Sequence, residues 1–351
     1  MLELMPLKAD AQAWRELAAR AAVPNPFYEP ELLLPAVRHL SGGDGVRLLI
    51  ATDARGAWIG LLPVVRLRRW HGMPTVAHAT WVHPYCFLGA PLLAVGHEDE
   101  AARALLATLR RRAVLVAMEY LPADGAMVAA CRRPVVWNAW ERAALHRRPQ
   151  DDYVETTLAS KRRRELRRLR TRFEAEQGGP LRCEEATVGD GAVETFLALE
   201  ASGWKGRAGT AMQSAAHADF FRETCAAFAA CERLQLVALR AAGRTIAMQC
   251  NLLAGDGVFC FKLAVDEDYA RYSPGVQLQV DNVHLFHDRP GLQWEDSCAD
   301  PENQMINRLW PDRRHLTSVI APGAGAVGRL GRAQAGAAVA IRSRLLKESE
   351  Q

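Results

Sequence analysis

Apolar residues in the second half of the chain fall into short runs that glycine-containing turns separate. Residues 234–240, 245–254 and 258–265 read as strands, and the segments "AAGR" and "GDG" between them suit tight hairpins. This pattern predicts an antiparallel meander of three strands. Just before it, apolar residues from Phe221 to Cys231 recur at spacings of four, three and three, which indicates an amphipathic helix with Ser214 as its N-cap.

The first half of the chain shows the same order of elements. The segment "VRLLIATDARGAWIGLLPVVRLRR" predicts a hairpin, and "TWVHPYCFLGAPLL" predicts a further extended stretch. "EDEAARALLATLRRR" is typical of a helix and "AVLVAMEYL" of a buried strand. A helix, a meander, a second helix and a strand therefore occur twice. We predict an α/β (α+β) protein with two similar domains, at 1–150 and 151–335, and a C-terminal tail at 336–351.

Bulk composition narrows the class of protein. A length of 351 residues, 49% apolar and 24% charged, suits about two globular domains. No run of 18 apolar residues predicts a transmembrane helix, and the N-terminus lacks the features of a secretory signal. The eight cysteines show no CxxC spacing, which favours a reduced, cytoplasmic protein. The net charge of +4 is too small to predict a specific nucleic-acid partner.

The strongest local charge lies near the join between the two halves. Eight of the twelve residues in 161–172 are basic, while Leu158, Leu166, Leu169 and Phe173 fall near one face of a helix. One interpretation is a solvated helix that packs through its leucines. The other interpretation is a face that binds anions: CoA phosphates, an acyl carrier protein, tRNA or an anionic membrane. If the ligand is a membrane, we expect a peripheral protein at the inner membrane.

A second change of pattern follows the strand 258–265, where an acidic loop leads to Ser-Pro-Gly. Ser273 can cap a helix, and Pro274 suits the first helical position. Gly275 leaves space beside first-turn amide groups that lack partners. A helix that begins in this way after a strand either is purely structural or binds an anion such as phosphate.

These segments together resemble the GNAT acyltransferase superfamily, in the branch of CelD-like or BioF-associated acetyltransferases that is related to the Fem-type aminoacyl transferases. The resemblance is carried by "ASKRRRELRRLRTRFEAEQG", "FLALEASGWKGRAGTAM", "FCFKLAVDEDYARYSPGVQLQ" and "DSCADPENQMINRLWPDRR". It covers about 150–320, and it implies tandem GNAT-like domains, each with a mixed, mainly antiparallel sheet flanked by helices.

The resemblance also implies where an acyl donor binds. The central strand, here 258–265, parts from its neighbour and pairs with the pantetheine arm of acyl-CoA, and the next loop and helix N-terminus hold the pyrophosphate. The donor-binding residues implied here are Lys262, Ala264, Val265, Arg271, Ser273, Gly275 and Val276. "RYSPGV" replaces the usual glycine-rich loop, and Fem-type relatives use aminoacyl-tRNA, so acyl-CoA, acyl carrier protein and aminoacyl-tRNA all stay open as donors. Acyl-CoA is expected as a co-substrate, with no permanently bound cofactor.

Acyl transfer to an amine needs a base and an acid. Acidic residues end two strands, and a carboxylate there can act as the base. We predict Asp296 in that role, with Glu295 and the pair Asp266 and Glu267 as alternatives. The other interpretation of Asp296 is a loop acid that caps Arg308, Arg313 or Arg314. Tyr272 or Tyr269 is the candidate acid toward the thiolate, and the alternative is that the thiolate leaves unaided. The resemblance places Trp204 and Lys205 at the acceptor, and Tyr269 is a further candidate there.

His284 and His287 are three apart on one helix, but no third ligand with fitting geometry is evident, so no metal site is predicted. We therefore predict an N-acyltransferase that transfers an acyl group directly to an amine, such as a sphingoid base or an amino sugar. The alternatives are an aminoacyl-tRNA-dependent transferase of the Fem type and a non-catalytic module that binds membrane or nucleic acid through its basic helix.

Overall fold

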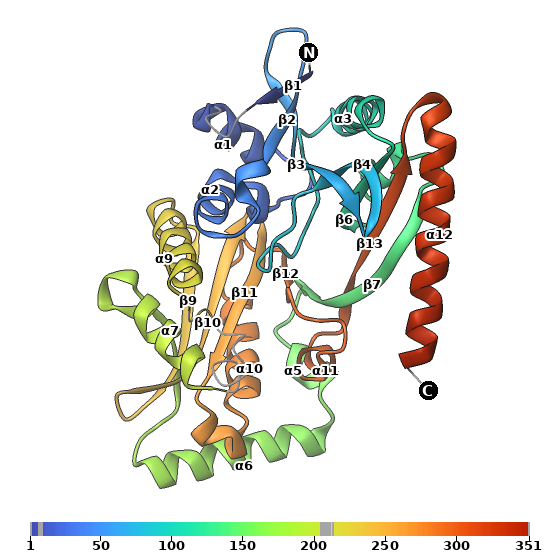
Figure 1. Ribbon diagram of the computed structural model, residues 1–351. Coiled ribbons are helices and arrows are strands. Elements are labelled where there is room, and N and C mark those ends of the chain that lie inside the picture. Colours follow the sequence, from blue (N-terminus) through green and yellow to red (C-terminus); the bar gives the residue numbers. More distant parts are fainter. Residues whose placement is uncertain (1, 6–9, 204–211, 213, 350–351) are drawn as a thin grey trace. The chain divides into compact units, whose positions relative to one another are not determined.

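The computed structural model describes residues 2–5, 10–203, 212 and 214–349 of the chain (Figure 1). The chain divides into two compact units, one made of 1–140 together with 315–351 and the other of 141–314. This division differs from the predicted one at 150 and 335, because the C-terminal segment returns to the sheet of the first unit. Of the residues predicted as a tail, 336–349 belong to a long helix.

The first unit contains a mixed sheet with helices beside it. Its strands lie in the order β1-β2-β3-β4-β6-β13, in which β4 and β6 are parallel and the other neighbours antiparallel. Their bounds are β1 Leu2–Met5, β2 Arg47–Thr52, β3 Trp58–Trp70, β4 Met73–Thr80, β6 Leu115–Pro122 and β13 Asp312–Pro322, with a two-residue β5 at Leu92–Leu93. The helices are α1 Ala11–Ala19, α2 Pro30–His39, α3 Glu98–Arg112, α4 Ala126–Ala130 and α12 Gly325–Ser349.

The second unit repeats this arrangement. Its strands lie in the order β7-β12-β11-β10-β9-β8, in which β11 and β12 are parallel and the other neighbours antiparallel. Their bounds are β7 Val135–His146, β8 Arg182–Ala186, β9 Leu234–Ala241, β10 Arg244–Ala254, β11 Gly257–Val265 and β12 Trp294–Asp296. The helices are α5 Tyr153–Thr157, α6 Ser160–Gln177, α7 Ala192–Ser202, α9 Ala215–Ala230, α10 Pro274–His287 and α11 Gln304–Leu309, with a 3₁₀ segment η4 at Glu267–Tyr272.

Both units show why the sequence pattern repeats. A meander (β2-β3-β4 or β9-β10-β11) is followed by a helix that crosses over to a parallel strand, β6 after α3 and β12 after α10. The predicted hairpins, helices and buried strand of this pattern are confirmed, as is the α/β fold class. The hydroxyl of Ser214 accepts from the backbone N–H of His217 at 3.3 Å, as expected for the N-cap of α9. In contrast, the extended stretch expected at 80–93 contains only the last residue of β4 and the two-residue β5, because Pro84, Gly89 and Pro91 interrupt it.

The core of the second unit positions the candidate site. One apolar cluster packs α10 and α11 against β7 and β11, with Trp310 and Val258 fully buried. Another packs Phe173 of α6 against β9, β10 and Tyr272. Burial of side chains of this size is the main stabilising contribution to such a layer. Among the described residues, no helix is both long and apolar enough to cross a membrane.

Candidate active site

Strand β11 has a partner along its whole length on one edge and for only three residues on the other. It pairs with β10 from Gly257 to Val265, whereas its parallel pairing with β12 stops at Phe259 and Asp296. The backbone from 260 to 265 therefore faces no neighbouring strand on the β12 side among the described strands. An unpaired strand edge of this kind can accept hydrogen bonds from an extended ligand.

A change of register adds to this opening. Cys250 lies opposite Lys262 and Asn251 opposite Cys260, so Phe261 has no counterpart in β10. A bulge of this type bends the strand and turns side chains away from simple alternation. Phe261 packs on Phe221 of α9, with ring centroids 6.2 Å apart, and Lys262 lies toward α7.

The helix that follows β11 begins differently from the prediction. Ser273 takes a left-handed conformation (φ 54°, ψ 50°), and its hydroxyl makes no cap hydrogen bond, so the predicted N-cap bond is wrong. Pro274 is the first helical residue, as predicted. A side chain on Gly275 would lie 3.4 Å from Val265 and 3.6 Å from Met305. Gly275 therefore brings α10 close to β11 and α11.

A cavity of about 470 Å³ lies at this end of α10. Val276 lines it from the first turn of α10, and Gln304, Met305, Arg308 and Leu309 line it from α11. The remaining lining residues come from the start of α6 and the segment before it: Thr157, Leu158, Ala159 and Arg162. Two arginines and no carboxylate line this cavity. A helix N-terminus carries a partial positive charge and unpaired N–H groups, which suit an anion. Of the two arginines, Arg162 also donates to Glu165 at 2.8 Å.

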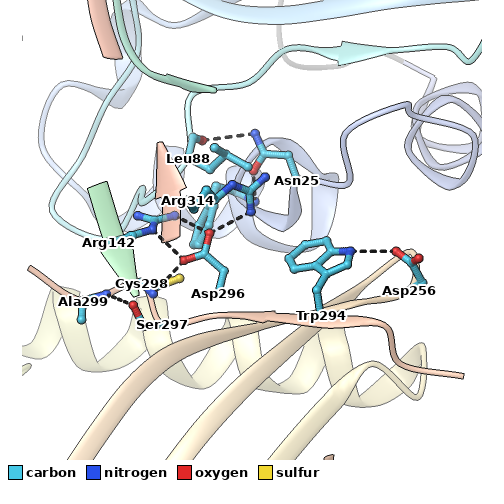
Figure 2. A network of polar contacts seen from close by, with 11 residues as sticks. Asn25, Leu88, Arg142, Asp256, Trp294, Asp296, Ser297, Cys298, Ala299 and Arg314 are labelled. Atoms are coloured by element: carbon cyan, nitrogen blue, oxygen red, sulfur yellow. Dashed lines mark hydrogen bonds and ion pairs between the residues drawn. The ribbon is translucent and has the colours of Figure 1, made fainter. Parts of the chain in front are cut away.

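Asp296 lies in a buried ion triad (Figure 2). Nε of Arg142 lies 2.6 Å from Oδ1, Nη1 of Arg314 lies 2.8 Å from Oδ2, and the backbone N–H of Cys298 donates to Oδ1 at 3.0 Å. Burial would raise the pKa of Asp296, but the two guanidinium groups outweigh it and hold the pKa below its usual range. A fully buried carboxylate with both oxygens held in this way is a poor proton acceptor. These contacts argue against the predicted role of Asp296 as the base.

Glu295 points to the other face of β12, as alternation along a strand requires. It is buried, and the side-chain amide of Asn282 in α10 donates to its two carboxylate oxygens at 3.2 and 3.4 Å. Burial raises the pKa of Glu295 to about 8, although the Asn282 hydrogen bond opposes this shift. The group is therefore protonated at neutral pH. The side-chain amides of Gln249, Asn251 and Gln279 are also buried and form hydrogen bonds with one another.

The other predicted catalytic residues are held by structural contacts. Asp266 pairs with Arg244 at 2.7 Å and caps η4 by accepting from the N–H of Asp268. The hydroxyl of Tyr272 donates to Glu176 of α6, and its ring packs against Phe173. These contacts leave neither residue directed at the open edge of β11, which argues against their predicted roles as base and acid.

Two further predicted binding residues also contact α6. Arg271 pairs with Glu176 at 2.9 Å, and the hydroxyl of Tyr269 donates to Gln177 at 3.4 Å. The predicted donor-binding residues Ala264 and Val265 do lie on the unpaired part of β11, and Val276 lines the cavity. Trp204 and Lys205 lie outside the described residues.

A buried carboxylate that the sequence analysis missed lies beside β11. Glu200, near the end of α7, is 3% exposed, and its Oε1 lies 3.8 Å from Nζ of Lys262. Its Oε2 accepts from the backbone N–H of Met212 at 3.0 Å. The signal in the sequence was an acid within the apolar run "FLALEAS", directly before the segment assigned to the acceptor. Glu267 also lies near this end of α7, since its Oε1 is 3.2 Å from where a Gly203 side chain would begin.

The basic helix α6 has some arginines that hold it to the protein and others that are exposed and open to an anionic ligand. Nη1 of Arg170 lies 2.9 and 3.0 Å from the two oxygens of Asp281, and its Nη2 donates to the carbonyl of Leu181, so Arg170 fastens α6 to α10 and the start of β8. Four cations are exposed and pair with no acid within the described part of the chain: Lys161, Arg164, Arg167 and Arg168. The described residues contain no group of three His, Cys, Asp or Glu placed to hold a metal ion.

Comparison with known proteins agrees with this geometry. Residues 160–294 match the family model described as an acetyltransferase (GNAT) domain. These residues form a GNAT domain. The match includes α6, α7, the meander, α10 and the beginning of β12, and it confirms the predicted GNAT domain in this part of the chain. No curated protein sequence matches the chain closely enough to count as a relative.

Solved structures extend the similarity of fold to both units. FemX superimposes with a TM-score of 0.62 at 9% identity, over 91% of this chain and 97% of FemX. L-PGS from Bacillus licheniformis gives 0.57 at 11% identity over 99% of both chains. The C-terminal domain of a putative lysylphosphatidylglycerol synthetase from Agrobacterium fabrum gives 0.56 at 11% identity, over 92% of this chain and 95% of that domain. These similarities show a common fold over both units.

Proposed function

We propose that the protein is an N-acyltransferase that moves an acyl group from a phosphate-bearing thioester, acyl-CoA or an acyl carrier protein, to an amine. One observation carries the proposal: the unpaired edge of β11 leads to the first turn of α10, where Arg162 and Arg308 line a cavity without carboxylates. The strand edge suits the amides of a pantetheine arm, and the cavity suits its phosphates.

We assign the acceptor site to the region between β11 and α7, where Lys262 lies beside Glu200. In the proposed reaction the amine nitrogen attacks the thioester carbonyl and the C–S bond breaks. Glu200 takes the proton that the nitrogen loses, and the thiolate leaves with a proton from solvent. Nζ of Lys262, 3.8 Å from Oε1 of Glu200, holds this carboxylate beside β11, where it can take up the proton.

A sphingoid base and an amino sugar are the acceptors that we favour among amines. A donor of the CoA type is a cytoplasmic metabolite, so the proposal places the protein in the cytoplasm. The exposed cations of α6 support a second candidate, an aminoacyl-tRNA donor, since a row of arginines and lysines suits a phosphate backbone.

Thermal unfolding in the presence of acetyl-CoA, palmitoyl-CoA or aminoacyl-tRNA distinguishes these donors. A ligand that binds only the folded state at 100 times its Kd stabilises it by about 2.7 kcal/mol. We expect a thioester of CoA to raise the unfolding temperature and tRNA to leave it unchanged. Stabilisation by tRNA alone would favour the second candidate, and no response to any donor would favour a non-catalytic module.

The role of Glu200 has its own test. Glu200→Gln should lower turnover about 10²–10⁴-fold, because general-base assistance is lost, while the Kd for the donor stays the same. Glu194→Gln is the matched control, since Glu194 lies on the same helix but is exposed and pairs with Arg222. Parental turnover of Glu200→Gln would remove Glu200 from the mechanism without affecting the donor site.

A further inference from the structure

Helix α12 packs on the rest of the first unit through its smallest residues. Gly328, Gly331, Ala335 and Ala338 are buried, and they recur at spacings of three, four and three. A side chain on Gly331 would begin 2.1 Å from the carbonyl oxygen of Val114, so only glycine permits this approach. One face of α12 is therefore fixed against the protein (Figure 1).

The face of α12 beside this contact is apolar and exposed. Val327, Leu330 and Ile341 are 49%, 54% and 57% exposed, which places them among the most exposed large apolar side chains of the described residues. At 100° per residue these three side chains and Ala337 lie within about 80° of one another. Between 333 and 341 the one polar residue is Gln334, and its side chain accepts from the hydroxyl of Thr75 at 3.0 Å. An exposed apolar face of this length is typical of a surface that binds another protein or a membrane.

The charge of this segment indicates which kind of partner binds the apolar face. The sequence has no aspartate or glutamate from 313 to 347, and Arg329 and Arg332 are exposed, with no acid paired to either in the described part of the chain. The partial positive charge of the helix N-terminus adds to these two cations. An anionic lipid surface complements this excess of positive charge.

We propose that α12 docks on an anionic bilayer and lies along its surface. Val327, Leu330 and Ile341 would enter the boundary between headgroups and acyl chains, with Arg329 and Arg332 near the lipid phosphates. This is the geometry of an interfacial amphipathic helix, and it agrees with the absence of a membrane-crossing helix among the described residues. The proposal does not depend on the acyl-transfer reaction.

Binding of the full chain to phosphatidylcholine vesicles, with and without phosphatidylglycerol, tests this proposal. We expect binding that requires phosphatidylglycerol and weakens as salt rises. We expect vesicle binding to weaken about 100-fold in the triple variant Val327→Ser, Leu330→Ser, Ile341→Ser. About half of each parental side chain is exposed to water, and the bilayer would bury that apolar surface. Arg329→Gln with Arg332→Gln should weaken vesicle binding about 30-fold and reduce its dependence on salt.

The matched control removes two exposed arginines from α6 instead. Arg164→Gln with Arg168→Gln has the same change in charge and should leave vesicle binding as in the parent. Circular dichroism shows whether each variant is folded, and a folded parent that ignores phosphatidylglycerol vesicles would overturn the proposal. So would a loss of binding in the α6 variant but not in the α12 variants. A dimer that the serine substitutions dissociate, with no vesicle binding, would assign this face to a second copy of the chain.

Discussion

Glu295 predicts an unusual pH dependence of stability. The pKa of a glutamate is 4.5 without burial, and burial raises that of Glu295 to about 8 in the folded protein. Between these values the folded state keeps a proton that the unfolded state has released, so the free energy of unfolding falls as pH rises. The contribution of Glu295 is most favourable below pH 4.5 and is lost as the pH rises through about 8.

The magnitude follows from the shift. Each pKa unit corresponds to about 1.4 kcal/mol, so a displacement of three to four units makes the ionised side chain cost roughly 4–5 kcal/mol at high pH. Glu295→Gln keeps the shape and the capacity to accept from Asn282 but does not titrate. The variant should therefore gain stability relative to the parent as pH rises, by roughly 3–5 kcal/mol between pH 5 and pH 8.5.

Urea unfolding of both proteins at several pH values measures this difference, and every other titrating group cancels in it. Glu302→Gln is the control, because Glu302 is exposed, and its difference from the parent should stay flat. A difference for Glu295→Gln that does not change between pH 5 and pH 8.5 would refute the assigned pKa shift.

Three further outcomes follow from the ion pairs of the second unit. Asp296→Asn should destabilise the fold by about 3–5 kcal/mol at pH 7, because Arg142 and Arg314 would keep their charges without a buried anion. Near-parental stability with lost turnover would instead restore Asp296 as the base. Since the folded pKa of Asp296 is lowered, its contribution in the parent should persist above about pH 3.9 and disappear as pH falls through the folded value, which acid unfolding of parent and Asp296→Asn can compare. Arg170→Gln should cost about 1.5–3 kcal/mol in urea unfolding and Arg167→Gln less than about 0.5, and equal costs would mean that the pair of Arg170 with Asp281 contributes no net stability.

Elements that depend on near neighbours in sequence could be predicted. The meander β9-β10-β11 follows from alternating apolar runs and two short turns, and α9 follows from its apolar spacing and the Ser214 cap. The parting of β11 from β12 was implied by the resemblance and is present in the strand pairing. Each of these features depends on a segment of about ten to thirty consecutive residues.

Features that depend on distant residues could not be predicted. Asp296 looked like an available acid at a strand end, but its partner Arg142 is 154 positions away and enters through the pairing of β12 with β7. Tyr272 was a candidate acid, yet its hydroxyl donates to Glu176 of α6, 96 positions earlier. The return of 315–322 to β6 of the first unit moved the domain boundary for the same reason. No local pattern encodes which charges meet in the folded chain.

The most direct test of the account is the titration of acetyl-CoA into the parent protein and an Arg162→Gln, Arg308→Gln variant by calorimetry. Both arginines line the cavity at the start of α10, and loss of a charge-assisted hydrogen bond to phosphate costs about 1.5–3 kcal/mol. We predict saturable binding to the parent, affinity at least about 100-fold weaker in the variant, and parental affinity in an Arg164→Gln control on the same helix. Equal affinity in the parent and the cavity variant, or no binding to the parent, would contradict the assignment of this cavity to the donor.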